Sequence, residues 1–233
     1  MSENIKKITK AFMADLDSRE NQSIILKPSA RPFNNQTHQV NEVAKKIYKL
    51  IEGAKHSNDG IILNRNKIKE AFFSPFKPQL KDAKVFLSHS HADKNKALKV
   101  KNYLESETNH RVFIDSLFWD YKDDVLNELA KYDNTSKIKD AFTLILRESL
   151  QDMIEKCPYF VFLQSNNSVS CNQDLSCITY SAWIYEELKI AHSIRESRPT
   201  PMMESWQAFH DISPFLENLE TITLKELSQQ INS

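Results

Sequence analysis

From Lys84 onward, short apolar segments alternate with stretches of helical spacing, and this alternation constrains the fold more than any other feature of the chain. The segments that predict strands are residues 85–87, 111–115 and 159–163. The segments that predict helices begin near Asp93, cover residues 142–154, and run from about 181 to 196. Strands that alternate with helices imply a parallel sheet with helices on both faces, joined by right-handed crossovers. We therefore predict an α/β fold.

The residues before position 81 are predicted to form a mostly helical extension. Helical spacing of apolar residues predicts short helices around Ile5, Ile8 and Phe12, over 40–54, and over 68–73. Residues 22–39 are rich in Asn, Gln and Pro and are predicted to be loop. Two prolines, at positions 75 and 78, favour a domain boundary between residues 74 and 82. The predicted domains are thus 1–80, a regulatory or partner-binding extension, and 81–233.

The end of the chain is poorly patterned. Residues 198–233 contain three prolines and predict at most a short strand around Met202 and a terminal helix over 224–231. An irregular last third is therefore expected.

Charge and hydropathy exclude some classes of function. The chain of 233 residues carries 31 basic and 31 acidic residues, so its formal net charge is zero. This balance gives no reason to expect wholesale binding to nucleic acid or to an anionic membrane. The first residues lack the apolar run of a secretory signal, and no stretch approaches the roughly 20 apolar residues that span a bilayer. We therefore expect a soluble, cytoplasmic protein.

Cysteine and glycine usage narrows the chemistry further. Cys157, Cys171 and Cys177 form neither an even set nor a CxxC pair, which favours reduced thiols, with Cys157 in the core. Gly53 and Gly60 are the only glycines, so the chain has neither a Walker loop nor a GxGxxG fingerprint. Any nucleotide must be held in another way.

Ligands of open parallel sheets bind outside the carboxyl ends of the strands. The three predicted strands are followed by residues 88–93, 115–121 and 164–168, which are rich in Ser, His, Asp, Asn and aromatic residues. We expect a polar pocket at this edge of the sheet.

Four segments in this part of the chain resemble, in order, a Toll/interleukin-1 receptor (TIR) domain of the bacterial kind. The first reads Phe-Leu-Ser-His-Ser-His-Ala-Asp-Lys at 86–94, and the second reads Phe-Ile-Asp at 113–115. The third is the apolar strand and its Ser-Asn-Asn-Ser end at 160–168, and the fourth is Trp-Ile-Tyr-Glu-Glu-Leu at 183–188. The match covers residues 84–196, about half of the chain. It implies a flavodoxin-like parallel sheet.

The resemblance implies that the protein cleaves the bond between nicotinamide and ribose in NAD, with Glu187 as the catalytic residue. Substrate contacts would come from Ser88, His89, Ser90, Asp93, Asp115 and Trp183, and from Phe118 and Trp119 in a loop after the second strand. NAD would be a substrate rather than a cofactor, and no metal is expected. The resemblance further implies homo-oligomers formed through TIR contacts, a role in prokaryotic antiviral defence, and an effector protein that senses the product.

The proposed chemistry is reasonable for these residue types. Nicotinamide is a good leaving group, so the reaction needs no general acid, and its transition state has the character of an oxocarbenium ion. One carboxylate can bind the ribose hydroxyls and stabilise the developing positive charge. Trp183 lies one helical turn before Glu187 and would border the same pocket. Aromatic residues such as Phe118, Trp119 and Tyr121 can stack on a base or on the pyridinium ring.

Several alternatives remain open at this point. Glu186 is a rival to Glu187, Trp183 can be core, and Phe118 and Trp119 can serve packing or a protein contact. Many TIR domains are scaffolds without activity, and nucleoside deoxyribosyltransferases share a similar sheet and a carboxylate that acts on a sugar.

A metal-dependent hydrolase is a lower alternative. His89, His91 and Asp93 resemble the opening of a metallo-β-lactamase motif, but Lys94 replaces the final histidine. The chain also departs from the TIR pattern, because residues 116–132 contain neither Gly nor Pro and residues 171–180 look like an insertion that acts as a lid.

Overall fold

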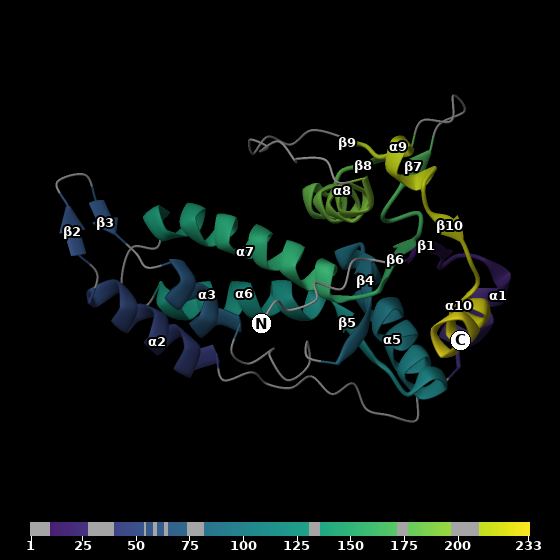
Figure 1. Ribbon diagram of the computed structural model, residues 1–233, viewed down its shortest axis with the longest axis horizontal. Helices are drawn as coiled ribbons and strands as arrows, with labels where there is room; N and C mark the ends of the chain where they lie inside the picture. The colour runs from purple at the N-terminus through teal and green to yellow at the C-terminus, as the bar shows by residue number, and fades with distance from the viewer. Residues whose placement is uncertain are drawn as a thin grey trace. The chain divides into compact units, whose positions relative to one another are not determined.

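The computed structural model describes residues 10–27, 40–53, 55–57, 60–62, 65–73, 82–130, 136–171, 177–196 and 210–233 (Figure 1). The chain forms two compact units. The first unit contains Met1–Phe33, Asp82–Ser116 and Gln151–Ser233, and the second contains Asn34–Lys81 and Leu117–Leu150. We describe each unit by itself.

The first unit is built on a sheet of five parallel strands in the order β10-β1-β6-β4-β5. The strands are β1 (Lys10–Asp15), β4 (Ala83–His89), β5 (Arg111–Ile114), β6 (Tyr159–Gln164) and β10 (Glu220–Thr221). The predicted flavodoxin-like α/β class is confirmed. A flavodoxin-like sheet has the strand order 2-1-3-4-5. Read from the β5 edge, this sheet places β5, β4 and β6 at the first three positions of that order and the N-terminal strand β1 at the fourth.

The N-terminal strand β1 corrects the sequence interpretation. We predicted a helix around Phe12 and a helical extension over 1–80, and both predictions are wrong for this segment, because β1 pairs along its whole length with β6. Ala11, Phe12 and Ala14 are buried, since β1 lies between two other strands and has helices over its faces. Such a strand lacks the alternation of a half-exposed strand, and its few apolar residues also fit helical spacing. Residues 10–27, the described part of this segment, therefore belong to the α/β unit.

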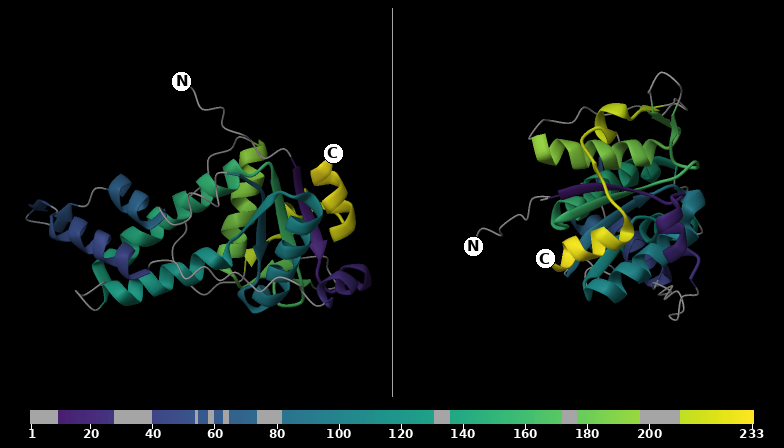
Figure 2. Two further views of the ribbon diagram at one scale, coloured as in Figure 1. Left: turned by 90° about the horizontal axis from the view of Figure 1, so that it is seen from below. Right: turned by 90° about the vertical axis from the view of Figure 1, so that its right-hand side faces the viewer.

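Helices cover both faces of this sheet. On one face lie α1 (Arg19–Ile25), α5 (Lys94–Thr108) and α10 (Leu224–Asn232), and on the other face lies α8 (Ala182–Glu196), as Figures 1 and 2 show. The predicted helices over 181–196 and 224–231 and the helix after Asp93 are confirmed. The predicted loop over 22–39 begins inside α1, and residues 28–39 lie outside the described part of the chain.

A row of three phenylalanines crosses the middle of the sheet. Phe86 on β4 stacks on Phe113 of β5 at 5.7 Å and on Phe160 of β6 at 5.9 Å between ring centroids. The three side chains are buried and occupy matching register positions. Because side chains alternate along a strand, Ser88 lies on the same face as Phe86, two residues nearer the carboxyl edge. The apolar row thus lies directly beneath the polar residues at the carboxyl edge of the sheet.

The second unit is mostly helical. It contains α2 (Val40–Glu52), the hairpin β2 (Lys55–Ser57) and β3 (Gly60–Ile62), α3 (Arg65–Phe73), most of α6 (Ser116–Leu129) and the larger part of α7 (Ser136–Lys156). Apolar faces of α2 and α3 are buried through Val43, Ile47, Ile51, Ile68 and Phe72. The helices predicted over 40–54, 68–73 and 142–154 are confirmed, while the boundary predicted between 74 and 82 falls almost wholly outside the described residues.

Helix α6 is a second correction, because we predicted a loop over 116–132. Tyr121, Val125 and Leu129 are buried and recur every four residues, which is the spacing of a helix face. Tyr121 packs edge-on against Phe72 at 5.1 Å between centroids. The charged residues between them concealed this stripe, and the absence of Gly and Pro was in fact a helix signal.

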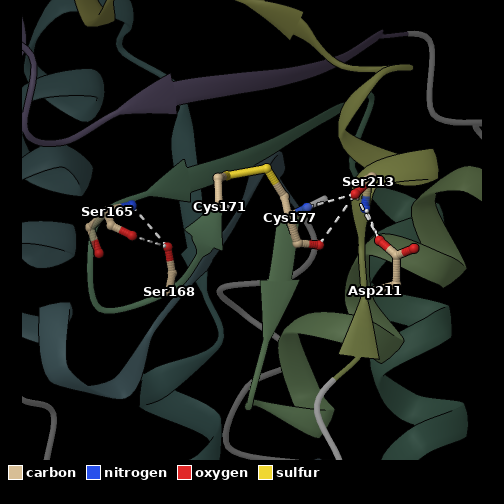
Figure 3. The surroundings of a disulfide bond; sticks show 6 residues. All are labelled: Ser165, Ser168, Cys171, Cys177, Asp211 and Ser213. Carbon is tan, nitrogen blue, oxygen red and sulfur yellow. Dashed lines mark hydrogen bonds between the residues drawn. A yellow bond between two sulfur atoms is a disulfide. The ribbon is translucent and has the colours of Figure 1, made fainter. Parts of the chain in front are cut away.

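Two strands before α8, β7 (Ser170–Cys171) and β8 (Cys177–Thr179), form a small antiparallel sheet with β9 (His210–Asp211), which follows α8 in the chain. Cys171 and Cys177 are joined by a disulfide (Figure 3), so the prediction that they are reduced thiols is wrong. The antiparallel pairing of β7 with β8 sets the two cysteines opposite each other, which a sequence pattern cannot show. Cys157 is free and buried, as predicted.

The elements that remain are short. η1 (His91–Asp93) follows β4, and α9 (Ser213–Leu216) follows β9. The strand predicted around Met202 lies outside the described residues. No helix among the residues that the structure describes is long and apolar enough to cross a membrane.

Candidate functional site

Five polar side chains are buried together at the carboxyl edge of β4 and β5. Ser88 and His89 end β4, Asp115 and Ser116 follow β5, and Glu187 lies in the second turn of α8, which packs on β4. Each is buried, and Ser88, Ser116 and Glu187 have no exposed surface (0 %). We call these residues the Glu187 cluster. Four of them are predicted site residues that the fold brings together, and Ser116 was not singled out from the sequence.

The Glu187 carboxyl group is sealed from solvent and lacks a well-formed hydrogen bond. Neither Oε1 nor Oε2 has a hydrogen bond of standard geometry, and the same holds for the Ser88 and Ser116 hydroxyls, although Ser88 and Asp115 lie close enough to Glu187 to act on its pKa as hydrogen-bonding groups. An unpaired buried polar group costs about 1–3 kcal/mol of stability, so such groups are rare in folded proteins. A cluster of them in one place is a feature of functional sites rather than of cores.

The surroundings of Glu187 favour its uncharged form. Burial raises the pKa of Glu187 well above its usual value, and the negative charge of nearby Asp115 raises it further. The Ser88 hydroxyl acts in the opposite direction, because as a hydrogen-bond donor it favours the ionised carboxylate. Burial and Asp115 outweigh Ser88, so the surroundings favour the protonated carboxyl group over the carboxylate.

His89 and Asp115 form a charge pair beside Glu187. The distance from His89 Nε2 to Asp115 Oδ1 is 3.0 Å, and His89 Nδ1 lies 2.6 Å from the carbonyl oxygen of Ser90. Since both ring nitrogens face oxygen acceptors, the doubly protonated imidazolium suits this position best. Burial lowers the pKa of His89, but Asp115, the Ser90 carbonyl and the charge of Asp93 outweigh burial, so the pKa is raised overall.

Asp93, another predicted substrate contact, has internal partners instead. The Ser165 hydroxyl donates to Asp93 Oδ2, and the Asn167 amide donates to Oδ1 at 2.9 Å. Lys96 Nζ lies 3.7 Å from Asp93 Oδ1 and 2.9 Å from Asp17 Oδ1. These residues, here called the Asp93 network, link the ends of β4, β6 and β1. The network thereby holds the loops at the carboxyl edge together.

Glu186 and Glu187 have different surroundings, although both are buried. Glu186 Oε1 lies 3.8 Å from Lys189 Nζ on the same helix. Glu187, one residue later, turns to the strand ends, where Asp115 and Ser88 act on it. This difference separates the two rivals that the sequence left open and favours Glu187 as the site residue.

The three aromatic residues of the predicted site lie on two helices, α8 and α6. Trp183 is half-buried in the first turn of α8, one turn before Glu187. Phe118 and Trp119 lie on α6 rather than in a loop, and their side chains are outside the described part of the structure. Ser90 is half-buried and contributes its carbonyl to His89. The stacking role of the three aromatic residues stays a prediction.

The metal-site alternative finds no support in the part of the chain that is described. Within it, no group of three or more His, Cys, Asp or Glu side chains is arranged to hold a metal ion. His89 uses both nitrogens within the protein, and His91 is exposed. A shallow hollow of about 480 Å³ is lined by residues of β10 and α10, among them Glu220, Glu226 and Gln230. Since β1 and β6 separate β10 from β4 in the sheet, this hollow is not part of the Glu187 cluster.

In comparisons with known proteins, no family model matches the chain, and neither a curated protein nor a solved structure shows significant similarity to it. The residues of the site are therefore the basis for inferring the function of the protein.

Proposed function

We propose that the protein is a TIR-type enzyme that cleaves the nicotinamide–ribose bond of NAD, as a glycohydrolase or an ADP-ribose cyclase. The observation that carries the proposal is Glu187, a fully buried carboxyl group without a hydrogen bond of standard geometry, held over the carboxyl edge of a parallel sheet. Ligands of such sheets bind at this edge. The order of the strands β5, β4 and β6 and the place of α8 agree with the resemblance of the four motifs.

In the proposed reaction, the bond between C1′ of ribose and N1 of nicotinamide breaks, and its electron pair goes to the pyridine nitrogen. The Glu187 carboxylate binds the ribose hydroxyls and stabilises the oxocarbenium-like transition state. Water, or a nucleophilic atom of the same ADP-ribose, then bonds to C1′ and releases a proton. Nicotinamide leaves as a neutral molecule, so no general acid is needed.

Substrate can reach Glu187 only after a rearrangement, because the carboxyl group has no exposed surface. We propose that the rearrangement accompanies self-assembly of the protein, so that activity appears at high concentration or after an activating signal. Ser88, His89 and Ser90 would then contact the substrate from β4, and Trp183 would do so from α8. Phe118 and Trp119 are proposed to stack on the nicotinamide or adenine ring.

We place this activity in the cytoplasm, in prokaryotic antiviral defence, where a cyclic product would act on an effector protein. The Cys171–Cys177 disulfide counts against a reducing compartment, since disulfides are rare there. Alkylation of thiols in freshly lysed cells decides the point. We expect the disulfide to protect both cysteines from alkylation, and modification of both thiols would contradict the disulfide.

A second candidate, a nucleoside deoxyribosyltransferase-like enzyme, is favoured by one specific observation. Glu187, a buried carboxyl group with a raised pKa beside the His89–Asp115 pair, suits a substrate whose leaving group needs a proton. A nucleoside base is such a leaving group, whereas the nicotinamide of NAD is not. A scaffold without activity is the third possibility, and it would make Glu187 dispensable.

The test compares the wild type with Glu187→Ala and Glu186→Ala, each at high concentration with a crowding agent. Each protein is incubated with NAD and, separately, with deoxynucleosides, and the products are resolved by chromatography and mass spectrometry. We expect nicotinamide release by the wild type and by Glu186→Ala, and none by Glu187→Ala. The second product distinguishes a hydrolase from a cyclase. Turnover of deoxynucleosides alone would favour the second candidate, and equal NAD turnover by all three proteins would refute the role of Glu187.

A further inference from the structure

Packing alone does not explain why His89 and Asp115 form a buried charge pair. Both side chains are nearly or fully buried, with 1 % and 5 % of their surfaces exposed, and their nearest atoms are 3.0 Å apart. Burying two charges far from water is costly, and an apolar pair of the same size would serve the core as well or better. The pair lies directly beside Glu187, whose ionisation Asp115 influences. The pair is therefore placed to act on the ionisation of Glu187.

The imidazole ring of His89 is fixed from both sides. Its Nδ1–H donates to the Ser90 carbonyl at 2.6 Å, which leaves Nε2 directed at Asp115. The Ser90 carbonyl itself is held, because it accepts the backbone N–H of Asp93 at 2.8 Å. A turn of the ring would therefore break its contacts with both the Ser90 carbonyl and Asp115. Asp115 is held in turn beside Glu187, since its partner is rigid.

We propose that His89 and Asp115 are positioning residues that set the protonation state of Glu187. The His89 imidazolium lies against Asp115, and the negative charge of Asp115 adds to the effect of burial in favouring a proton on Glu187 while the site is sealed. The carboxylate that the reaction requires then forms when water enters the site and takes up the proton of Glu187, a step that a cation near the pair would favour. The positive pyridinium ring of NAD is a cation of this kind. This inference rests on the proposed function for its consequence on turnover.

The other charged groups around Glu187 do not take over this role. On α8, Glu186 and Lys189 lie 3.8 Å apart and offset each other. On the side of η1, Asp93 acts on His89 and is occupied by its own donors. Ser88 on β4 is uncharged and works against Asp115. Burial raises the pKa of Glu187 most, and among the charged groups around it Asp115, and through it His89, has the main influence.

The test is a direct titration of the Glu187 side chain in full-length protein without substrate. Glutamate is labelled with ¹³C in its side-chain carboxyl group, and the Glu187 resonance is identified by its loss in Glu187→Gln. Its pH transition is then measured in the wild type, Asp115→Asn and His89→Gln. Asp17→Asn is the matched control, because it makes the same chemical change in the Asp93 network.

The two variants are expected to shift the transition in opposite directions. Asp115→Asn removes the neighbouring negative charge, so the transition of Glu187 moves to lower pH by about one unit or more. His89→Gln removes the cation that offsets the two carboxyl groups, so their upper transition moves to higher pH. Asp17→Asn leaves the transition in place. A purely structural role of the pair would not produce shifts of opposite sign.

The proposal is overturned if neither variant moves the transition, or if both move it in the same direction. If Asp115→Asn fails to fold, as judged by circular dichroism, His89→Gln decides alone. An upward shift then supports the proposal, and no shift or a downward shift refutes it.

Turnover gives a second and separate reading. If the protein cleaves NAD, Asp115→Asn should extend nicotinamide release to lower pH. Opposite shifts in the titration with no NAD cleavage would support the positioning pair and refute the proposed reaction. NAD cleavage without these shifts would support the proposed reaction and refute the positioning pair.

Discussion

The Asp93 network and the Glu187 cluster lie at the same edge of the same sheet, but they differ in how well the hydrogen-bonding needs of their buried carboxyl groups are met. In the Asp93 network, both carboxylate oxygens accept hydrogen bonds, and a lysine lies nearby. In the Glu187 cluster, both carboxyl oxygens of Glu187 are buried and accept none of standard geometry. The first arrangement stabilises the loops, and the second is held at a cost to stability. This difference is the basis on which we propose the Glu187 cluster, rather than the Asp93 network, as the active site.

Breaking the Asp93 network should have the largest effect. Asp93→Ala leaves the donors of Ser165, Asn167 and Lys96 without their buried acceptor, so the free energy of unfolding should fall by about 3–5 kcal/mol. Denaturant unfolding measures the change. Asp17→Asn, which removes one partner of an ion pair near the surface, should cost less than about 1 kcal/mol. Equal costs for the two variants would show that Asp93 is not the centre of the network.

Removing one donor from the network should cost less than removing its acceptor. The Ser165 hydroxyl donates to Asp93 and accepts the backbone N–H of Asn167 at 3.0 Å. Ser165→Ala should therefore lower the free energy of unfolding by about 1–3 kcal/mol. Ser170→Ala, at an exposed position of β7, is the control and should stay within about 0.5 kcal/mol of the wild type. A loss for Ser165→Ala as small as that of the control would contradict the account.

The same kind of change in the Glu187 cluster should have the opposite sign. Glu187→Met keeps the length of the side chain and removes two buried oxygens without well-formed hydrogen bonds, so the free energy of unfolding at neutral pH should rise by about 1–2 kcal/mol. Calorimetry or denaturant unfolding measures it. A loss of several kcal/mol, as for Asp93→Ala, would mean that Glu187 is a structural residue and that the comparison fails.

The pH dependence of stability should also distinguish the two regions. Because the folded pKa of Glu187 is raised, its stabilising contribution is complete below its unfolded value of about 4.5 and is lost as pH rises through the folded value. His89 acts in the same direction, with its contribution complete below about 6.5. Each group alone lowers stability by at most about 1.4 kcal/mol per pH unit in its window.

Subtracting the Glu187→Gln curve from that of the wild type isolates the glutamate. The difference in unfolding free energy should favour the wild type most at acid pH and decline as pH rises. A difference that does not change with pH would show that the carboxyl group of Glu187 titrates as it does in the unfolded chain.

Much of the site could be predicted because its signals are local. The apolar runs of β4, β5 and β6 and the spacing of α8 are visible in short windows, and each strand ends in the polar residues that form the cluster. Glu187 itself was singled out by the resemblance to TIR domains, through its place four residues after Trp183. The choice between Glu186 and Glu187 needed the structure, since both belong to one helical turn and only their neighbours differ.

Other features depend on partners that are distant in the sequence. The pairing of His89 with Asp115 requires the register of β4 and β5, and the partners of Asp93 lie more than seventy residues away, at Ser165 (72) and Asn167 (74). Strand β1 was missed because its short apolar run also fits a helix, and only its neighbours β6 and β10 select the strand. The disulfide was missed for the same reason, because a hairpin brings its cysteines together.

The most direct test of the central claim measures activity and stability on the same pair of variants. Glu187→Gln and Asp93→Asn are compared with the wild type for the rate of nicotinamide release and for the free energy of unfolding at one pH. The account predicts that Glu187→Gln reduces release at least about 100-fold while its stability is unchanged or higher. Asp93→Asn should lose stability, and the protein that remains folded should keep its rate to within a few-fold. If Glu187→Gln cleaves NAD at the wild-type rate, the Glu187 cluster is not the active site.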